Sequence, residues 1–546
     1  MDKSLIKSIE NSLKQHWDLP ALSDYKGSVF HYKDLAVNIA KIHILFEQIG
    51  VEQGDRVAIC GKNSANWGIV YLATLTYGLV AVPILNEFKQ DNIHNIINHS
   101  ESRIFIASAS VWENLNSELM PNVDTFIMLN DFSIIRSKQH KVFEVRETLN
   151  KLFGKKYPKD FGPENISYFE ENPEDLCMIN YTSGTTGFSK GVMLPYRCLH
   201  NNMVFAYEVL SELKAGDTIV SMLPTAHMYG FSFEFLYEMI RGVNVHFLTK
   251  TPSPNVILEA FAALRPRMIV TVPLILEKIY KKTLLPKISK PLMRTLLHVP
   301  VVDKQILNKI NKALCKVFGD NFIEVIIGGA AFNPEIELFF KRIGFRYTVG
   351  YGMTECGPII TYEGWKNHKL YSCGRKATNM EIRVDSPDPQ NVVGEVHCKG
   401  PNVMLGYYKN EEATQAQFTD DGWMKTGDLG VIDRDGFLFL KGRNKSMILG
   451  PSGQNIYPEE IESKINTSPY VLESLVVEQG ERIVALVYPD FELMKEDQKD
   501  PETTMKELMT LVNTELPVYS QLSTIKIHPE EFEKTPKRSI KRFMYQ

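Results

Sequence analysis

Short apolar segments alternate with helical segments along most of the chain, and this alternation constrains the fold more than any other feature. Residues 55–60 (DRVAIC) are typical of a buried strand, and residues 64–84 of a helix followed by a second strand. Strands that alternate with helices indicate open, mostly parallel sheets with helices on both faces, so the sequence predicts an α/β fold. Further strand candidates are RIFIAS (103–108), TFIML (125–129), TIVSML (218–223), NVHFL (244–248), MIVTVP (268–273), EVIIGGA (324–330) and RYTVGYG (346–352).

Length, charge and cysteine content narrow the class of protein. A chain of 546 residues is long enough for two or more domains. A net charge of −4 argues against a protein held to nucleic acid by positive charge. No apolar run approaches the roughly 20 residues that span a bilayer, and residues 1–17 are typical of a short amphipathic helix, not of a signal peptide. Seven cysteines without CxxC spacing indicate reduced thiols, so we expect a cytoplasmic protein without a cysteine-based zinc site.

A domain boundary is expected within residues 440–462, where Gly, Asn and Pro cluster and a new helix begins at Pro458. The segments that follow read as a small α/β unit with strands at 474–479 and 482–489. We therefore expect a large N-terminal domain over residues 1–443 and a small C-terminal domain over residues 444–546. Residues 135–172 are polar and are predicted to form an irregular excursion at the surface.

Residues 181–194 (YTSGTTGFSKGVML) contain Ser, Thr, Gly and Lys between two apolar runs, directly after the strand candidate LCMINY. Glycines allow the backbone to approach an anion, hydroxyl groups donate hydrogen bonds to it, and Lys190 adds positive charge. The pattern is not a Walker A motif, because GxxxxGK[ST] is absent. The sequence thus indicates a phosphate-binding loop, and the alternative is a flexible surface hairpin.

Five motifs in order resemble the adenylate-forming superfamily of acyl-CoA synthetases, luciferases and peptide-synthetase adenylation domains. The resemblance covers most of the chain and is strongest to fatty-acyl-CoA ligases. It implies a large N-terminal domain of stacked, mostly parallel sheets with helices and a small, mobile C-terminal α/β domain. The motifs are YTSGTTGFSKGV (181–192), LPTAHMYGF (223–231), GYGMTECGP (350–358), GWMKTGDLGVIDRDGFLFLKGR (422–443) and GQNIYPEEIE (453–462).

The resemblance implies that a carboxylate attacks the α-phosphate of ATP, and that a thiol such as coenzyme A then displaces AMP. Thr354 would bind the α-phosphate, Glu355 and Thr186 would hold Mg²⁺, and Asp428 would accept both ribose hydroxyls. Arg443 would reach the ribose or the α-phosphate. The outer phosphates would be bound by Thr182, Ser183, Gly184, Thr185, Thr186, Gly187 and Lys190. The adenine would be lined by Gly329, Ala330, Ala331, Tyr351 and Gly352. The alternatives are a surface acid for Glu355, a turn cap for Asp428 and a structural ion pair for Arg443.

The same resemblance implies an acyl pocket beside the phosphates and a hinge between the domains. His227 would be a gate at the carboxylate, and no acid follows it before Glu234, which favours an uncharged, hydrophobic acyl group. The hinge would be Lys445, and the alternative is one more exposed lysine. The pocket itself would be lined by His227, Met228, Tyr229, Gly230 and Phe231, and the alternative for these residues is packing in the core.

One departure from the family pattern concerns the C-terminal lysine that catalyses adenylation. In the segment TPKRSIKR (535–542) the lysine position holds Ser539, which carries no charge. We hypothesise that Lys541 or Lys537 supplies the charge instead. A catalytically weak relative that binds fatty acid or acyl adenylate is the alternative that this serine supports.

Residues 278–316 are strongly basic and interleaved with apolar residues. A solvated helix face is the ordinary explanation, and contact with an anionic membrane on its inner face is the alternative. We expect an ATP- and Mg²⁺-dependent fatty-acyl-CoA ligase that uses free coenzyme A and does not bind nucleic acid. An acyl–acyl-carrier-protein ligase and an aryl-acid ligase remain alternatives.

Overall fold

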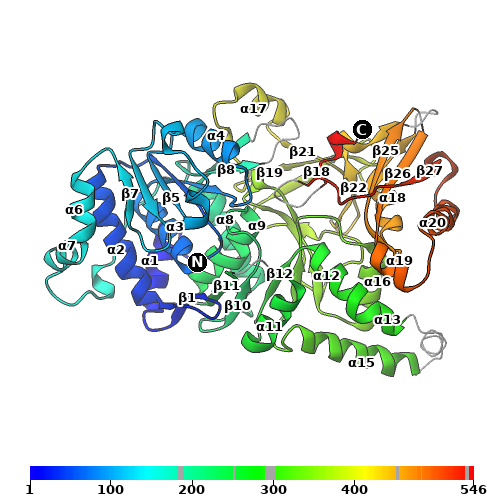
Figure 1. The fold of residues 1–546 in the computed structure, drawn as a ribbon, viewed down its shortest axis with the longest axis horizontal. Helices are drawn as coiled ribbons and strands as arrows, with labels where there is room; N and C mark the ends of the chain where they lie inside the picture. Colours follow the sequence, from blue (N-terminus) through cyan, green and yellow to red (C-terminus); the bar gives the residue numbers. More distant parts are fainter. Residues whose placement is uncertain are drawn as a thin grey trace.

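The computed structural model describes residues 1–182, 190–249, 253–288, 302–449, 454–480, 482–534 and 540–545. Figure 1 shows sheets and helices interspersed along the chain, with the C-terminal strands and helices, in orange and red, grouped at one end of the molecule. The α/β fold class predicted from the sequence is confirmed, with a large N-terminal domain and a smaller C-terminal one.

The largest sheet contains eight strands in the order β20-β9-β8-β4-β3-β5-β6-β7. Strands β8, β4, β3, β5 and β6 are parallel, whereas β7, β9 and β20 run antiparallel to their neighbours. The strands predicted at 55–60, 103–108 and 125–129 are therefore confirmed. The bounds are β3 (Arg56–Cys60), β4 (Val80–Ile84), β5 (Ile104–Ala107), β6 (Thr125–Met128), β7 (Ile134–Ser137), β8 (Leu176–Thr182), β9 (Lys190–Pro195) and β20 (Gly406–Tyr407).

Helix α3 (Ala65–Tyr77) is buried between this sheet and a second sheet, because it contacts β1 as well as β3 and β4. A helix that is apolar all round can be stable only when it is covered on every side. The approach is close at Gly68, where a Cβ atom would lie 2.7 Å from Leu22 Cδ1 and 2.8 Å from Phe235 Cε2. The second sheet has the order β10 (Thr218–Ser221), β11 (Asn244–Phe247), β1 (Pro20–Asp24) and β2 (Val29–His31).

A third sheet of three parallel strands places two of the sequence motifs side by side. It consists of β12 (Ile269–Thr271), β13 (Val325–Ile327) and β14 (Tyr347–Val349). Gly328 N donates to Thr271 O at 3.1 Å, and Gly350 N donates to Ile327 O at 2.9 Å. Because parallel strands end at the same edge of a sheet, the GGAA segment (328–331) and the GYG segment (350–352) leave the sheet together.

Two antiparallel sheets follow, and the strand–helix alternation did not predict them. One consists of β15 (Tyr351–Gly352), β16 (Ile359–Tyr362) and β17 (Arg375–Lys376). The other has the order β18 (Glu381–Asp385), β19 (Gly394–Lys399), β21 (Met424–Ile432) and β22 (Leu438–Arg443). In the second sheet Asp428 of β21 is paired with Arg443 of β22.

The C-terminal residues have an apolar core of their own. Strands β25 (Val471–Gln479), β26 (Arg482–Pro489) and β27 (Thr524–Ile527) form one sheet, with α18 (Pro458–Ile465), α19 (Phe491–Glu496) and α20 (Pro501–Glu515) beside it. Its largest buried cluster begins at Ile448, whereas the main N-terminal cluster ends at Leu438. The separation supports a boundary at residues 443–444, which remains a prediction.

The prediction of an irregular excursion over residues 135–172 is wrong, because this segment contains α6 (Lys141–Glu147) and α7 (Leu149–Lys156). Both helices pack against α2 (Tyr32–Ile49). They bury few apolar side chains, so their helical period is weak in the sequence. The amphipathic N-terminal helix is confirmed as α1 (Leu5–Gln15), whose apolar face is buried.

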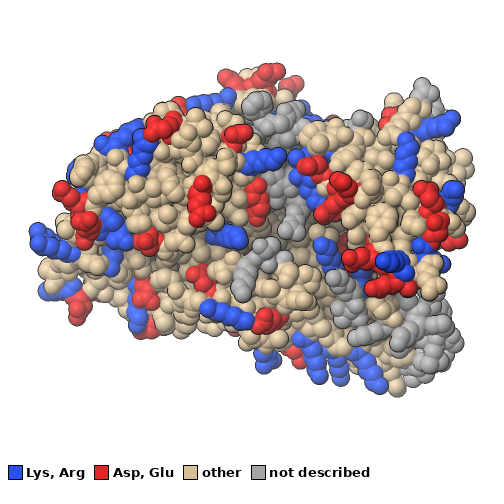
Figure 2. All heavy atoms as spheres, viewed as in Figure 1, with Lys and Arg blue, Asp and Glu red and all other residues tan. Residues whose placement is uncertain are grey.

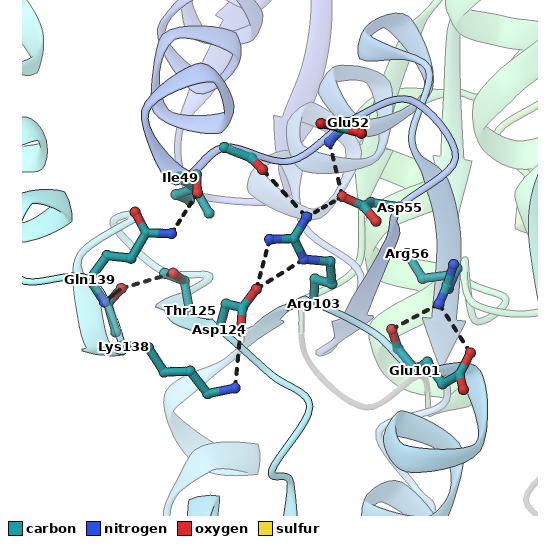
Figure 3. Close-up of polar contacts among 12 residues, drawn as sticks. Ile49, Glu52, Asp55, Arg56, Glu101, Arg103, Asp124, Thr125, Lys138 and Gln139 are labelled. Carbon is teal, nitrogen blue, oxygen red and sulfur yellow. Dashed lines mark hydrogen bonds and ion pairs between the residues drawn. The ribbon is translucent and has the colours of Figure 1, made fainter.

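An ion-pair network joins the amino-terminal ends of three neighbouring parallel strands (Figure 3). Arg103 directly precedes β5 and pairs with Asp55 before β3 (Nη1–Oδ2, 2.5 Å) and with Asp124 before β6 (Nη2–Oδ2, 2.9 Å). Lys138 also reaches Asp124 at 3.1 Å. Such partly exposed pairs contribute about 0–1 kcal/mol each, so their main effect is to align the strand ends. The phosphate-loop motif follows β8 at the opposite, carboxyl edge of the sheet.

Helix α10 (Tyr237–Arg241) contains a buried carboxyl group, that of Glu238, whose lost hydration no side-chain hydrogen bond replaces among the described residues. Glu238 has no exposed surface, and neither of its carboxylate oxygens has a hydrogen-bond partner among the described residues. Burial raises the pKa of Glu238 to about 8. In the unfolded chain the pKa lies near its ordinary value of 4.5. Between these two pH values the Glu238 carboxyl is protonated in the folded state and ionised in the unfolded state. The free energy of unfolding therefore falls as the pH rises through this range.

We expect the Glu238→Gln variant to gain stability relative to the wild type between about pH 5 and about pH 8, because it has no carboxyl group to ionise in the core. The relative gain should be on the order of a few kcal/mol, since each pH unit between the two pKa values contributes about 1.4 kcal/mol. Unfolding temperatures measured across this range test it, with the exposed Glu113→Gln as the control. Parallel pH profiles for Glu238→Gln and the wild type would contradict it.

Candidate active site

The predicted phosphate loop lies between two paired strands at the carboxyl edge of the largest sheet. Thr182 ends β8 and Lys190 begins β9, and the two residues are opposite each other in the antiparallel register. Thr182 Oγ1 donates to Lys190 O at 3.4 Å. The site residues Ser183, Gly184, Thr185, Thr186 and Gly187 lie outside the described residues, so the structure places only the two ends of this loop.

Glu355 lies next to the end of this loop and is held by a tyrosine. It belongs to the short helix η5 (Thr354–Cys356), and both Thr354 and Glu355 are buried. Tyr407 Oη donates to Glu355 Oε1 at 2.9 Å, and Lys190 Nζ lies 4.5 Å from the centre of the Tyr407 ring. Burial, and then the Glu355 carboxylate, raise the pKa of Tyr407, so the hydroxyl remains a donor. Glu355 Oε2 accepts no hydrogen bond from the described residues.

Asp428 forms a second buried carboxylate site on β21, with 9% of its surface exposed. Tyr351 Oη donates to Asp428 Oδ2 at 2.6 Å, and Arg443 Nε lies 3.2 Å from Asp428 Oδ1. Burial raises the pKa of Asp428, and the Arg443 charge and the Tyr351 hydrogen bond oppose this rise. The Arg443 side chain is 74% exposed, so the carboxylate lies at the base of an open position.

The predicted adenine residues lie at the ends of β13 and β14 and touch the predicted acyl residues. Gly329, Ala330 and Ala331 are exposed, and Gly329 has φ +83°. A Cβ atom at Gly328 would lie 3.0 Å from Tyr229 Cζ. Tyr229 Oη donates to Ile326 O at 3.1 Å. A Cβ atom at Gly352 would lie 2.1 Å from Pro358 O, so only glycine fits there.

The predicted acyl residues form the short helix α9 (Met228–Phe231), with His227 at its N-terminus. His227 is half-buried, and its Nδ1 accepts from Tyr229 N at 3.3 Å. Asn180 of β8 donates to Ala226 O at 3.0 Å and so ties this turn to the phosphate strand. Met228 and Phe231 are fully buried, and Phe231 packs against Tyr71 with ring centres 4.6 Å apart. Gly230 is buried under the backbone of Pro224.

A cavity of about 410 Å³ lies at the amino-terminal edge of the third sheet, where Met268 precedes β12 and Glu324 precedes β13, and none of the predicted acyl residues lines it. Phe205, Met268, Ile323 and Tyr362 are among its lining residues, together with Glu324, which accepts from Tyr362 Oη at 2.5 Å. Rings packed in the apolar core, in three successive contacts, lie between Tyr229 and the lining residue Tyr362. The contacts are Tyr229–Phe233 at 6.4 Å, Phe233–Phe205 at 6.4 Å and Phe205–Tyr362 at 5.6 Å between ring centres.

The predicted domain boundary at residues 443–444 follows β22, and both of these residues are exposed. Lys445, the predicted hinge, lies in the short helix η6 (Asn444–Ser446) and is exposed. Lys541 Nζ lies 3.4 Å from Glu533 Oε2. Lys537 and Ser539 lie outside the described residues, so the structure does not place them against the site.

Comparison with known families assigns the chain. The family model described as "AMP-binding enzyme" matches residues 9–408, and the model of the AMP-binding enzyme C-terminal domain matches residues 445–545. The chain belongs to the AMP-binding enzyme family. The resemblance to the adenylate-forming enzymes is thereby confirmed, and with it the general class of acyl- or aryl-acid ligases.

Relatives in the AMP-binding enzyme family differ in the thiol that their names specify. The chain is 27% identical to a long-chain-fatty-acid–CoA ligase of Rattus norvegicus, in an alignment that covers 88% of this chain and 76% of the relative. It is 26% identical to a chloroplastic long-chain-fatty-acid–[acyl-carrier-protein] ligase of Arabidopsis thaliana, in an alignment that covers 91% of this chain and 77% of the relative.

Solved structures of AMP-binding enzymes share the fold. The anthranilate CoA ligase AuaEII, in complex with anthranoyl-AMP, matches with a TM-score of 0.80 at 17% identity and covers 99% of this chain and 96% of that one. ATP-bound MatB from Rhodopseudomonas palustris matches with a TM-score of 0.77 at 22% identity and covers 100% and 98%.

Sequence reasoning missed Tyr407, which contacts Glu355. The two adjacent tyrosines in LGYYKN (405–410) carried no chemical pattern of their own, and only their position beside η5 and β9 reveals the contact with Glu355. The pairing of Tyr351 with Asp428 was missed as well, although both residues were predicted to bind the nucleotide.

Proposed function

We propose that this chain is an ATP-dependent fatty-acyl-CoA ligase, which forms an acyl adenylate and transfers the acyl group to coenzyme A. The observation that carries the proposal is the pair of buried carboxylates, each of which accepts a hydrogen bond from a tyrosine hydroxyl. Asp428, held by Tyr351 and Arg443, suits a ribose, and Glu355, beside Lys190, suits a metal–phosphate centre. Glu355 follows the carboxyl end of the parallel strand β14, where such sheets bind ligands, and Asp428 lies on β21 of the antiparallel sheet.

The residues around Glu355 fit Mg²⁺ and phosphate. Mg²⁺ prefers one or two carboxylates together with substrate phosphates to a cage of protein ligands, and no group of three or more His, Cys, Asp or Glu side chains in the described part of the chain forms such a cage. Glu355 Oε2 would hold the ion, together with Thr186. When bound, Mg²⁺ would neutralise charge on the phosphates. Lys190 and the loop from Thr182 would bind the outer phosphates, and Thr354 the α-phosphate.

The nucleotide would lie between Asp428 and the ends of β13 and β14. Asp428 would accept from both ribose hydroxyls while Tyr351 holds its other lone pairs. The exposed Gly329, Ala330 and Ala331 would line one side of the adenine, and Gly352 the other. Arg443 would reach the ribose or the α-phosphate from the edge of β22.

The residues around His227 support an acid with an apolar chain. Helix α9 is apolar and aromatic, and the next acid, Glu234, is buried and accepts from the backbone N–H groups of Met222 and Leu223. The acid would enter past His227 and would lie beside Tyr229. Relatives named as long-chain-fatty-acid ligases support this choice of substrate. Aryl acids and an acyl-carrier-protein acceptor are the alternatives.

We expect saturated fatty acids of increasing chain length to release pyrophosphate from ATP, and the acyl group to appear on coenzyme A only when coenzyme A is present. Pyrophosphate release with a panel of fatty and aryl acids, followed by thioester analysis with coenzyme A or acyl carrier protein, tests this. A preference for aryl acids or for acyl carrier protein would select the corresponding alternative. Binding of fatty acid without pyrophosphate release would identify a weak acyl-binding relative instead.

We propose that Lys541 or Lys537 supplies the charge that Ser539 cannot, and that the small domain moves about Lys445 between the two half-reactions. In the structure Lys541 is paired only loosely with Glu533, at 3.4 Å.

We expect one of the single variants Lys537→Ala and Lys541→Ala to slow adenylation at least tenfold, because a lost charge contact to the transition state costs about 1.5–3 kcal/mol. The rate of pyrophosphate exchange measures this. The matched control is Lys506→Ala, an exposed lysine of α20. Unchanged exchange in both variants would refute the substitution.

We also propose that the protein is cytoplasmic and that helix α15 (Val302–Val317) rests on the anionic inner face of the cytoplasmic membrane. Lys304, Lys309, Lys312 and Lys316 are exposed on this helix, and none forms an ion pair with another described residue. Figure 2 shows basic side chains along the edge of the molecule where Figure 1 places α15. No described helix has the length and apolar character to span a bilayer, so contact would be peripheral.

We expect the protein to co-sediment with phosphatidylglycerol vesicles at low salt and to be released at about 0.5 M salt, because such contacts are screened. The variant with Glu at 309, 312 and 316 should stay in the supernatant. A control with Glu at the exposed Lys495, Lys499 and Lys506 should sediment like the wild type. Equal sedimentation of both variants would contradict a role for α15.

A further inference from the structure

The segment before and including β20 joins the two motifs that are proposed to bind the phosphates. Met404 N donates to Glu355 O at 2.9 Å, so one end of the segment is attached to η5. Leu405 N donates to Met193 O at 2.9 Å and Tyr408 N to Gly191 O at 2.8 Å, so the other end is paired with β9. The backbone therefore fixes Tyr407 between the strand that begins at Lys190 and the helix that carries Glu355.

The Tyr407 side chain contacts both motifs at once. It is 5% exposed, and its hydroxyl donates to Glu355 Oε1 at 2.9 Å. A second acceptor, Gln417 Oε1, lies 3.1 Å from Tyr407 Oη. A phenol has a single hydrogen, and the charged carboxylate is the stronger acceptor. The face of the ring lies under Lys190 Nζ, and Lys190 forms no ion pair with another described residue.

We infer that Tyr407 is a positioning residue for the metal–phosphate centre, an inference that rests on the proposed function. Its hydroxyl occupies one oxygen of Glu355 and thereby leaves Oε2 for the metal ion in a fixed orientation. Its ring attracts the Lys190 ammonium through a cation–π contact and does not neutralise its charge. The charge therefore stays available for phosphate. Partners that orient a ligand in this way typically change metal affinity by about 10- to 100-fold when they are removed.

Tyr408 provides a matched control one residue away. Successive side chains of a strand point to opposite faces. Tyr408 Oη donates to Glu101 Oε2 at 3.1 Å, and Lys409 Nζ pairs with Glu101 Oε1 at 2.7 Å, both away from Glu355. Figure 3 shows the same Glu101 paired with Arg56 at the edge of the large sheet. Removal of the Tyr408 hydroxyl therefore perturbs the same segment without touching Glu355 or Lys190.

The test is a calorimetric titration of α,β-methylene-ATP into wild type, Tyr407→Phe and Tyr408→Phe, with and without Mg²⁺. We expect Tyr407→Phe to weaken the apparent Mg²⁺ affinity of the nucleotide complex by about 10- to 100-fold. The affinity for the nucleotide without Mg²⁺ should stay within about twofold of the wild type, because the ring beneath Lys190 remains. Tyr408→Phe should match the wild type in both titrations.

Three outcomes distinguish a failure of the positioning role from a failure of the proposed function. An unchanged Mg²⁺ affinity in Tyr407→Phe overturns the positioning role, and so does an equal loss of nucleotide affinity with and without Mg²⁺, which would show a structural role only. A wild-type protein that binds no nucleotide under either condition overturns the proposed function itself. A further variant, Tyr407→Ala, should also weaken nucleotide binding without Mg²⁺, because Lys190 loses the ring.

Discussion

Two carboxylates, Glu355 and Asp428, are withdrawn from water at the centre of the molecule, and each is held by a tyrosine hydroxyl. Removing a carboxylate from water costs several kcal/mol unless donors replace the lost solvent. Tyr407 and Tyr351 supply those donors, and Arg443 adds a charge beside Asp428. The arrangement keeps both groups buried and oriented, with Glu355 held at Oε1 and Asp428 held at both of its oxygens. The site depends on this compensation, because a carboxylate without donors would be driven to the surface or to its neutral form.

Glu238 shows the opposite case within the same fold. It is buried in α10 without a donor, and burial alone raises the pKa of its carboxyl to about 8. Glu234, on the preceding turn, is buried too, but Oε2 accepts from Met222 N and Leu223 N. Those bonds hold the backbone just before the turn that carries His227. Of these two buried acids, Glu234 stabilises the backbone through hydrogen bonds, whereas Glu238 has no hydrogen-bond partner among the described residues.

The parallel sheets explain why residues far apart in the sequence meet. β8 ends at the phosphate loop, β13 at the GGAA segment and β14 at the GYG segment, so all three leave their sheets from carboxyl ends. The C-terminal residues then rest beside this edge. Lys281 Nζ donates to Val471 O at 3.0 Å, and Asn333 Nδ2 donates to Ser463 O at 3.3 Å. Asn333 also caps α16 (Pro334–Ile343), the helix that follows GGAA, so this contact reaches the adenine side of the site.

Much of this architecture could be predicted from local patterns. The apolar run of α3 has no polar face and had to be covered on every side, and the strands at 103–108 and 218–223 were clear from their apolar character. The short helices α6 and α7 could not be predicted, because they bury too few side chains to show a period. The antiparallel strands β18 to β22 were missed for a related reason. Their partners are chosen by long-range pairing, which a local window does not contain.

The sequence by itself determined the α/β class, the order of the motifs and the kind of chemistry that their side chains allow, because these follow from composition and spacing along the chain. Only the tertiary structure decided which groups meet. Tyr407 lies 52 residues after Glu355 and Tyr351 lies 77 residues before Asp428, and no local rule joins them. Their contacts arise because long-range packing, such as the pairing of β20 with β9, places each buried carboxylate beside a donor.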